Sequence, residues 1–248
     1  MTKKIILIGL AVLLTGCIQS ASDESFSGGF VLDGKTVQFQ AEDNFTIVGT
    51  LWGDENSSKN PIVLIHQLGR DRHSFDSFAR RLFVKGFTVL SIDVRGHGES
   101  VKKGDEIIYY TDFVDEDFRK ISDDILKAKE FLKAEKILVV GASIGANSAL
   151  NYSVLDHSSA GIVLLSPGLD YKGIETKESS SQQNVPLFIA ASREDAYASQ
   201  SSQIIFDRGP LADKKLILLE NAGHGTDMLV SKRDFEEQVI DWLELHSS

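Results

Sequence analysis

Uninterrupted apolar runs alternate along this chain with segments in which apolar residues recur every three or four positions. An apolar run of about five residues is typical of a strand buried on both faces, and the longer spacing is typical of a helix. The buried strands are expected at residues 61–66, 87–92, 136–141, 161–165, 186–190 and 215–219. The helices are expected at residues 75–85, 118–132, 197–206 and 234–245. Alternating strands and helices predict an α/β protein with a mostly parallel sheet covered on both faces.

Two earlier segments, residues 36–40 and 45–52, alternate apolar and polar positions, which is typical of strands with one solvated face. We expect them to form an antiparallel pair that extends one edge, which makes eight strands in all. No linker divides residues 30–248, so this stretch is interpreted as one domain.

The first residues carry a different pattern. Lys3 and Lys4 precede a ten-residue apolar stretch at 5–14, which is the length of a signal-peptide core and too short to span a bilayer comfortably. Leu14-Thr15-Gly16-Cys17 then resembles the bacterial lipoprotein signal, in which cleavage leaves the cysteine as first residue and lipid is attached to it. The alternative is an ordinary signal peptide with an incidental cysteine.

The lipoprotein interpretation divides the chain into three parts. Residues 1–16 are the expected signal peptide, residues 17–29 are the lipidated Cys17 with a Ser- and Gly-rich tether, and residues 30–248 are the domain. Several acyl chains on one residue would anchor the protein firmly. We therefore expect a lipid-anchored protein of a cell membrane whose domain faces the extracytoplasmic side.

Composition narrows the possible partners. The 248 residues carry a formal net charge of −10, and Lys and Arg form no basic stripe, so the sequence does not indicate a nucleic-acid partner. Cys17 is the only cysteine, which excludes an intramolecular disulfide. No His pair at metal-ligand spacing and no carboxylate cluster suggests a metal site, and no cofactor is expected. The oligomeric state stays open, with a monomer as the default.

Candidate chemistry begins at Gly141-Ala142-Ser143-Ile144-Gly145, which follows the apolar strand and precedes a helix-like segment at 146–150. A serine on such a sharp strand-to-helix turn presents its hydroxyl at the top of the sheet. Small residues are needed there because the strand and the helix pass close together. Ser143 is therefore a candidate nucleophile, the alternative being a plain tight turn.

A serine nucleophile needs a base, and the base needs an orienting acid. In sheets of this type functional groups gather beyond the carboxyl ends of the strands. Asp195 follows the strand ending near 191, and His224 follows the strand ending near 220. The alternatives are Glu194 or Asp170 as the acid and His97 as the base.

These motifs together resemble the α/β-hydrolase superfamily. Besides the serine turn, residues 93–100 (Asp-Val-Arg-Gly-His-Gly-Glu-Ser) look like the family's D-x-R-G-x-G-x-S loop. Residues 66–69 (His-Gln-Leu-Gly) occupy the place of its H-G-x-G oxyanion loop. The resemblance implies a fold of eight strands in which Ser143 attacks, His224 transfers the proton and Asp195 orients the imidazole.

The same resemblance implies an oxyanion hole made by the backbone N–H groups of Ile144 and of a residue in the 66–69 loop. We expect Leu68 rather than Gln67 as the second donor. Gln67 departs from the family pattern, which has glycine there, and would place a polar side chain at the mouth of the site. His66 is expected to brace the oxyanion loop rather than to bind a metal.

The loop after residue 93 is given a supporting role, with Asp93 and Arg95 expected to lock it rather than to touch substrate. The polar stretch 166–185 is too short for a large cap domain, so the site should be open. Tyrosines are candidates for lining its entrance. They are Tyr109, Tyr110, Tyr171 and Tyr197.

The leading hypothesis is a serine carboxylesterase that acts on a small-molecule ester through an acyl-enzyme. Peptide or amide cleavage and thioester cleavage are alternatives on the same three residues. A lipid-anchored binding module without chemistry is the alternative from another class.

Overall fold

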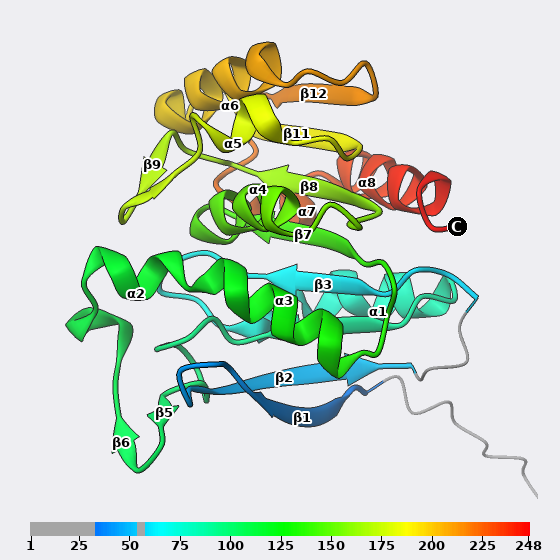
Figure 1. Ribbon diagram of the computed structural model, residues 1–248. Helices are drawn as coiled ribbons and strands as arrows, with labels where there is room; N and C mark the ends of the chain where they lie inside the picture. Colours follow the sequence, from blue (N-terminus) through cyan, green and yellow to red (C-terminus); the bar gives the residue numbers. More distant parts are fainter. Residues whose placement is uncertain (1–32, 54–57) are drawn as a thin grey trace, which may run out of the picture. The chain divides into compact units, whose positions relative to one another are not determined.

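An eight-stranded sheet forms the centre of the computed structural model, which describes residues 33–53 and 58–248 (Figure 1). In spatial order the strands are β1 (Lys35–Gln40), β2 (Thr46–Trp52), β4 (Val89–Ile92), β3 (Ile62–Ile65), β7 (Leu138–Ala142), β8 (Gly161–Leu165), β11 (Leu187–Ser192) and β12 (Lys214–Leu219). β2 runs antiparallel to both of its neighbours, and every other contact between adjacent strands is parallel. The predicted eight-stranded, mostly parallel sheet is confirmed.

The long apolar runs are explained by burial on both faces of the sheet. Every residue of β3, β4, β7, β8 and β11 is buried. Successive side chains of a strand point to opposite faces. In β3, Val63 and Ile65 accordingly join one hydrophobic cluster, whereas Ile62 and Leu64 join the other.

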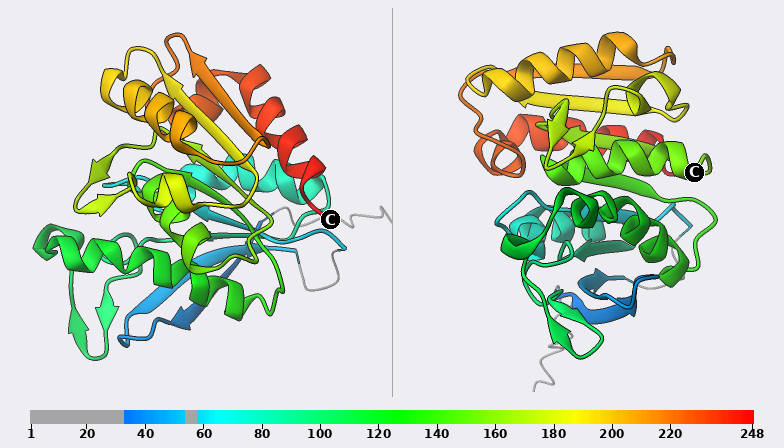
Figure 2. Two further views of the ribbon diagram at one scale, coloured as in Figure 1. Left: turned by 45° about the horizontal axis from the view of Figure 1, so that its top comes forward. Right: turned by 60° about the vertical axis from the view of Figure 1, so that its left-hand side comes forward.

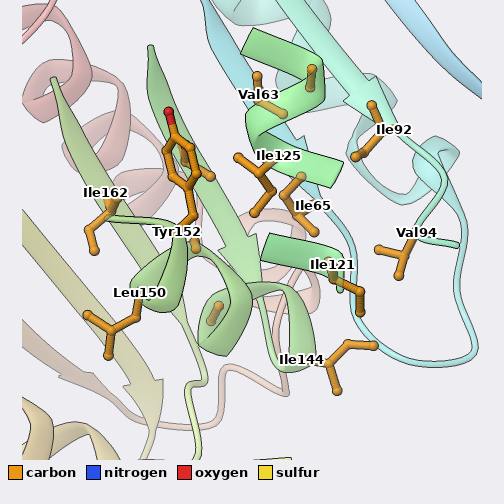
Figure 3. Packing of buried hydrophobic residues seen from close by; sticks show 14 of the residues in the cluster. Val63, Ile65, Ile92, Val94, Ile121, Ile125, Ile144, Leu150, Tyr152 and Ile162 are labelled. Atoms are coloured by element: carbon orange, nitrogen blue, oxygen red, sulfur yellow. The ribbon is translucent and has the colours of Figure 1, made fainter. Parts of the chain in front are cut away.

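Helices cover both faces (Figures 1 and 2). One face carries α2 (Asp115–Arg119), α3 (Ile121–Phe131), α4 (Ile144–Leu155) and α6 (Ala196–Arg208). The other carries α1 (Asp76–Val84), α7 (Asp227–Ser231) and α8 (Arg233–Leu245). Figure 3 shows the first core, where Ile121 and Ile125 of α3 lie beside Val63 and Ile65 of β3.

Several short elements were not expected from the periodicity. They are the hairpins β5 (Lys102–Lys103)–β6 (Glu106–Ile107) and β9 (Asp170–Tyr171)–β10 (Ile174–Glu175), the 3₁₀ turns η1 (Arg72–Phe75) and η2 (Tyr110–Asp112), and the one-turn helix α5 (Ser179–Gln182). Strands of two residues are too short to show a period. The helix expected over 118–132 is also divided at Lys120, into α2 and α3.

Between β8 and β11 the chain forms only the β9–β10 hairpin and α5, so the expected absence of a large cap domain is confirmed. Figure 1 shows β9 on the side toward which the arrowheads of β3 and β8 point. In residues 33–53 and 58–248 no helix is both long enough and apolar enough to cross a membrane. The expected signal peptide, Cys17 and the tether lie outside the described residues.

Candidate active site

Ser143 occupies the turn between β7 and α4 in a conformation that residues with side chains rarely adopt. Its backbone has φ 54° and ψ −114°. Non-glycine residues in such regions cluster at functional sites, where the surrounding structure holds them in place. Here the Ser143 N–H donates to the carbonyl of Leu165 at 2.9 Å, which ties the turn to β8.

The two glycines of the turn are required by close backbone approach. A Cβ on Gly141 would lie 2.2 Å from the carbonyl oxygen of Gly145, and a Cβ on Gly145 would lie 2.4 Å from that of Ile65. Neither backbone atom can move away without distorting the strand or the helix. The expected reason for small residues in this pentapeptide is therefore present in the structure.

Asp195 and His224 lie together beyond the ends of β11 and β12. The Asp195 carboxylate accepts a hydrogen bond from Nδ1 of His224 through Oδ2. Its other oxygen accepts the N–H of Ala198 at 3.2 Å and caps the first turn of α6. A carboxylate on Nδ1 fixes the imidazole with Nε2 as the basic nitrogen.

The two alternative acids are engaged elsewhere. Glu194 accepts from the hydroxyl of Ser192 at 2.5 Å and from the N–H of Asn221 at 2.8 Å. These hydrogen bonds, that of Ser192 first, lower the pKa of the exposed Glu194 carboxyl. Asp170 accepts the N–H of Gly173 at 2.9 Å within the β9–β10 hairpin. The structure therefore brings Asp195, and neither alternative, to His224.

The alternative base, His97, is buried in the loop that follows β4. Its ring stacks on Tyr110 at 4.0 Å between centroids, and its Nδ1 lies 3.1 Å from the carbonyl of Arg95. Burial lowers its pKa. His97 therefore serves the packing of this loop.

The loop carrying His224 is held by residues that the sequence did not single out. The hydroxyl of Ser166 accepts the N–H of Gly225 at 2.9 Å, and the hydroxyl of Ser231 donates to the carbonyl of Ala222 at 2.8 Å. Ser166, like Ser143, has a positive φ, 53°, directly after a buried strand. A serine after a strand is a weak signal by itself, so sequence reasoning could not identify it.

Gln67 corrects one expectation. Its side chain is buried rather than placed at the mouth of the site. The amide oxygen accepts from the N–H and the hydroxyl of Thr226 at 3.2 and 3.0 Å, and the amide nitrogen donates to the carbonyl of His224 at 3.4 Å. Gln67, which replaces the family's glycine, therefore joins the oxyanion loop to the loop that carries His224.

The backbone of the 66–69 loop and of the first residue of α4 has N–H donors available. The N–H groups of Ile144, Leu68 and Gln67 have no hydrogen-bond partner among the residues that the structure describes. Unpaired N–H groups at the start of a helix and in a neighbouring loop are what an oxyanion hole requires. Both Leu68 and Gln67 therefore present an N–H group that is available as the second donor.

His66 braces the oxyanion loop, as expected. Its Nδ1 donates to the carbonyl of Gln67 at 2.8 Å, and its Nε2 accepts the N–H of Val94 at 2.9 Å. Burial lowers the pKa of His66 to about 3, which keeps the ring neutral and able to accept that second bond. One imidazole thus links the loops after β3 and β4.

Buried ion pairs hold the loop after β4, in the role expected for Asp93 and Arg95. Asp93 pairs with Arg72 and accepts the N–H of Glu99 at 2.8 Å. Arg95 donates through Nε to Asp124 at 2.7 Å and through Nη1 to Asp43 at 3.0 Å.

The four tyrosines expected at the entrance separate into two groups. Tyr171 reaches the site: its ring lies edge-on to His224 at 6.4 Å between centroids, and the Ser143 side chain is near enough to its phenol to lower the pKa of that phenol. Tyr197 packs behind it at 5.5 Å. Tyr109 and Tyr110 instead line a separate cavity of about 480 Å³ beside Gly69.

No group of three or more His, Cys, Asp or Glu side chains is arranged to hold a metal ion within residues 33–53 and 58–248. The site as described consists of a serine, an imidazole–carboxylate pair and unpaired backbone donors. Groups of these kinds make up nucleophilic acyl-transfer sites.

Comparison with known proteins supports the fold. Residues 60–180 match a family model described as alpha/beta hydrolase fold. A serine hydrolase-like protein of Dictyostelium discoideum is 29% identical over 147 residues, which are 59% of this chain and 38% of that protein. The chain therefore spans well under half the length of this curated relative.

Solved esterases have the same architecture. The esterase Pf2001 of Pyrococcus furiosus aligns over 86% of this chain and 92% of its own, with a TM-score of 0.68 and 21% identity. An esterase of Exiguobacterium antarcticum aligns over 85% and 100%, with a TM-score of 0.68 and 15% identity. The sheet order, the family match and these structures agree: the chain has the α/β-hydrolase fold.

Proposed function

We propose that this protein is a serine hydrolase that cleaves carboxylic esters through an acyl-enzyme intermediate. The observation that carries the proposal is the Asp195–His224 pair at the same end of the sheet as Ser143 on its strained turn. The likeness to a serine hydrolase-like protein and to esterases supports it.

The first half-reaction acylates the serine. His224 Nε2 takes the hydroxyl proton as Ser143 Oγ attacks the ester carbonyl carbon. The carbonyl oxygen becomes an oxyanion that the N–H groups of Ile144 and Leu68 bind, and Asp195 stabilises the imidazolium. When the carbonyl re-forms, the bond to the alcohol oxygen breaks and His224 delivers the proton to that oxygen.

The second half-reaction repeats these steps with water. His224 takes a proton from the water molecule, whose oxygen attacks the acyl carbon. The bond to Ser143 Oγ then breaks, and the serine recovers its proton from His224. The products are a carboxylic acid and free enzyme.

The test is a panel of short-chain esters with the full chain in detergent and with Ser143→Ala as the control. We expect hydrolysis by the parent, its loss in the variant, and covalent labelling of the parent alone by a fluorophosphonate. Equal hydrolysis by both proteins would contradict the proposal. Amide and thioester substrates in the same panel test the alternative bonds, and a parent inert toward all of them would favour the binding module.

We further propose that Cys17 carries lipid and anchors the domain on the extracytoplasmic face of a cell membrane. The Leu14-Thr15-Gly16-Cys17 sequence supports this. Cys17→Ser should move the protein out of the membrane fraction and abolish incorporation of a labelled fatty acid. Unchanged partitioning would refute the anchor without affecting the proposed chemistry.

A further inference from the structure

Tyr171 lies beside the residues assigned to the chemistry, although it belongs to none of the family motifs. The Ser143 side chain lies near enough to its phenol to lower the pKa of that phenol, and the edge of its ring meets His224 at an interplanar angle of 84°. It comes from the β9–β10 hairpin, which lies between β8 and β11 in the chain.

The hairpin holds the Tyr171 ring firmly. The hydroxyl of Tyr197 lies 3.0 Å from both the N–H and the carbonyl oxygen of Asp170. Gly168 allows the two rings to pack closely, because a Cβ there would lie 2.7 Å from the ring of Tyr171 and 2.8 Å from that of Tyr197. Tyr197 thus fixes the hairpin backbone, whereas Tyr171 packs its ring against His224.

The position of this hydroxyl defines which substrate oxygen it can reach. The carbonyl oxygen points to the backbone N–H groups of Ile144 and the 66–69 loop. The leaving-group oxygen must instead lie beside His224, which protonates it, and next to the carbon that Ser143 attacks. A phenol that lies near Ser143 and whose ring packs against His224 is therefore on the leaving-group side.

We propose that Tyr171 is a further catalytic residue, whose phenol donates a hydrogen bond to the alcohol oxygen of the ester as that oxygen leaves. The proposal rests on the esterase function above. In this step the bond from the acyl carbon to the alcohol oxygen breaks and the bond to Ser143 Oγ remains. His224 supplies the proton that the alcohol acquires, and Tyr171 keeps its own.

The surroundings favour a phenol that stays protonated. Burial first, then the charge of Asp195 and the neighbouring Tyr197, raise the pKa of Tyr171, and the nearby Ser143 side chain opposes this only in part. Tyr171 therefore acts as a neutral donor throughout the pH range in which an esterase is assayed.

In this role, the rate increase that the Tyr171 hydroxyl supplies depends on the leaving group of the ester. An alkoxide is a poor leaving group that needs stabilisation and a proton, whereas p-nitrophenolate departs without help. A thioester sulfur is a weak hydrogen-bond acceptor and gains little. The hydroxyl of Tyr171 thus favours esters of ordinary alcohols.

The test compares the parent with Tyr171→Phe on two esters of the same acid, an ethyl ester and a p-nitrophenyl ester. We expect kcat/KM to fall about thirtyfold on the ethyl ester, in the range for losing one donor, and to change by less than about threefold on the p-nitrophenyl ester. Tyr197→Phe is the matched control and should change both esters by the same factor. Labelling of Tyr171→Phe by a fluorophosphonate at the parent's rate would show that its Ser143 is intact.

The outcomes separate the two proposals. A parent inactive on both esters would refute the esterase function and this role with it. An active parent whose Tyr171→Phe variant loses the same factor on both esters would overturn the leaving-group role alone. The same leaving-group dependence in Tyr197→Phe would also overturn it, because the effect would then come from the hairpin and not from the Tyr171 hydroxyl.

Discussion

The side chain of Gln67 bonds both the backbone N–H and the hydroxyl of Thr226, a residue 159 positions further along the chain. Gln67 belongs to the loop that carries the oxyanion donors, and Thr226 follows the proposed base by two positions. The Gln67 amide thus fixes the distance between the N–H groups of the oxyanion loop and the imidazole of His224.

Replacing Gln67 by Ala should therefore affect both stability and rate. The buried N–H and hydroxyl of Thr226 would lose their partner, which costs about 1–3 kcal/mol. Misplacement of the histidine loop should lower kcat about ten- to a hundredfold. Urea unfolding and steady-state kinetics measure the two effects. Unchanged kcat in a folded variant would show that the loops keep their spacing without this amide.

Asp195→Asn should remove activity while leaving the fold intact. Asparagine caps a helix as well as aspartate does, so the first turn of α6 keeps its partner. It does not hold the imidazole in the required tautomer, and we expect kcat to fall by about 10³- to 10⁴-fold. Glu194→Gln, one residue away on the exposed side, is the control and should keep its rate. If kcat fell more in Glu194→Gln than in Asp195→Asn, the acid would be Glu194.

The close approach at Gly145 predicts a sharp difference between two glycine substitutions. Gly145→Ala places a methyl group against the carbonyl of Ile65, and we expect a loss of about 3 kcal/mol. Gly86→Ala, where a Cβ meets nothing within 4 Å, should cost only the left-handed backbone, about 1 kcal/mol. Thermal or urea unfolding of the two variants measures this ranking. Equal losses would mean that the turn can relax.

His66 predicts a dependence of stability on pH. Its pKa is about 3 in the folded protein and near 6.5 when unfolded, so below pH 6.5 the unfolded state binds a proton that the folded state refuses. The contribution of His66 to the free energy of unfolding is fully present above pH 6.5 and is lost as the pH falls toward 3. From pH 7 to pH 5 the free energy of unfolding should fall by about 2 kcal/mol because of this residue.

Urea unfolding at these two pH values checks the His66 prediction. His66→Gln should lose about 2 kcal/mol less than the parent between them. His73→Gln, which removes an exposed imidazole, is the control and should follow the parent. Identical pH slopes for all three proteins would show that His66 titrates in the folded state.

The sequence predicted the strands well because a strand buried on both faces consists of consecutive apolar residues, as β3 does. It also predicted that Asp195 and His224 follow adjacent strands, and neighbouring parallel strands place such residues together. It failed at contacts made by side chains from distant segments. The direction of the Gln67 side chain, the support from Ser166 and the contact of Tyr171 with His224 depend on how three loops pack. Single residues in polar loops carry no periodic signal of that packing.

The carboxylate of Asp195 serves two partners at once, the N–H of Ala198 through one oxygen and the imidazole of His224 through the other. Opening the first turn of α6 would release both oxygens together. Helix ends open locally far more often than a whole domain unfolds. Mild denaturant should therefore inactivate the enzyme before its sheet unfolds, with hydrogen exchange at Ala198 rising in step with the loss of activity.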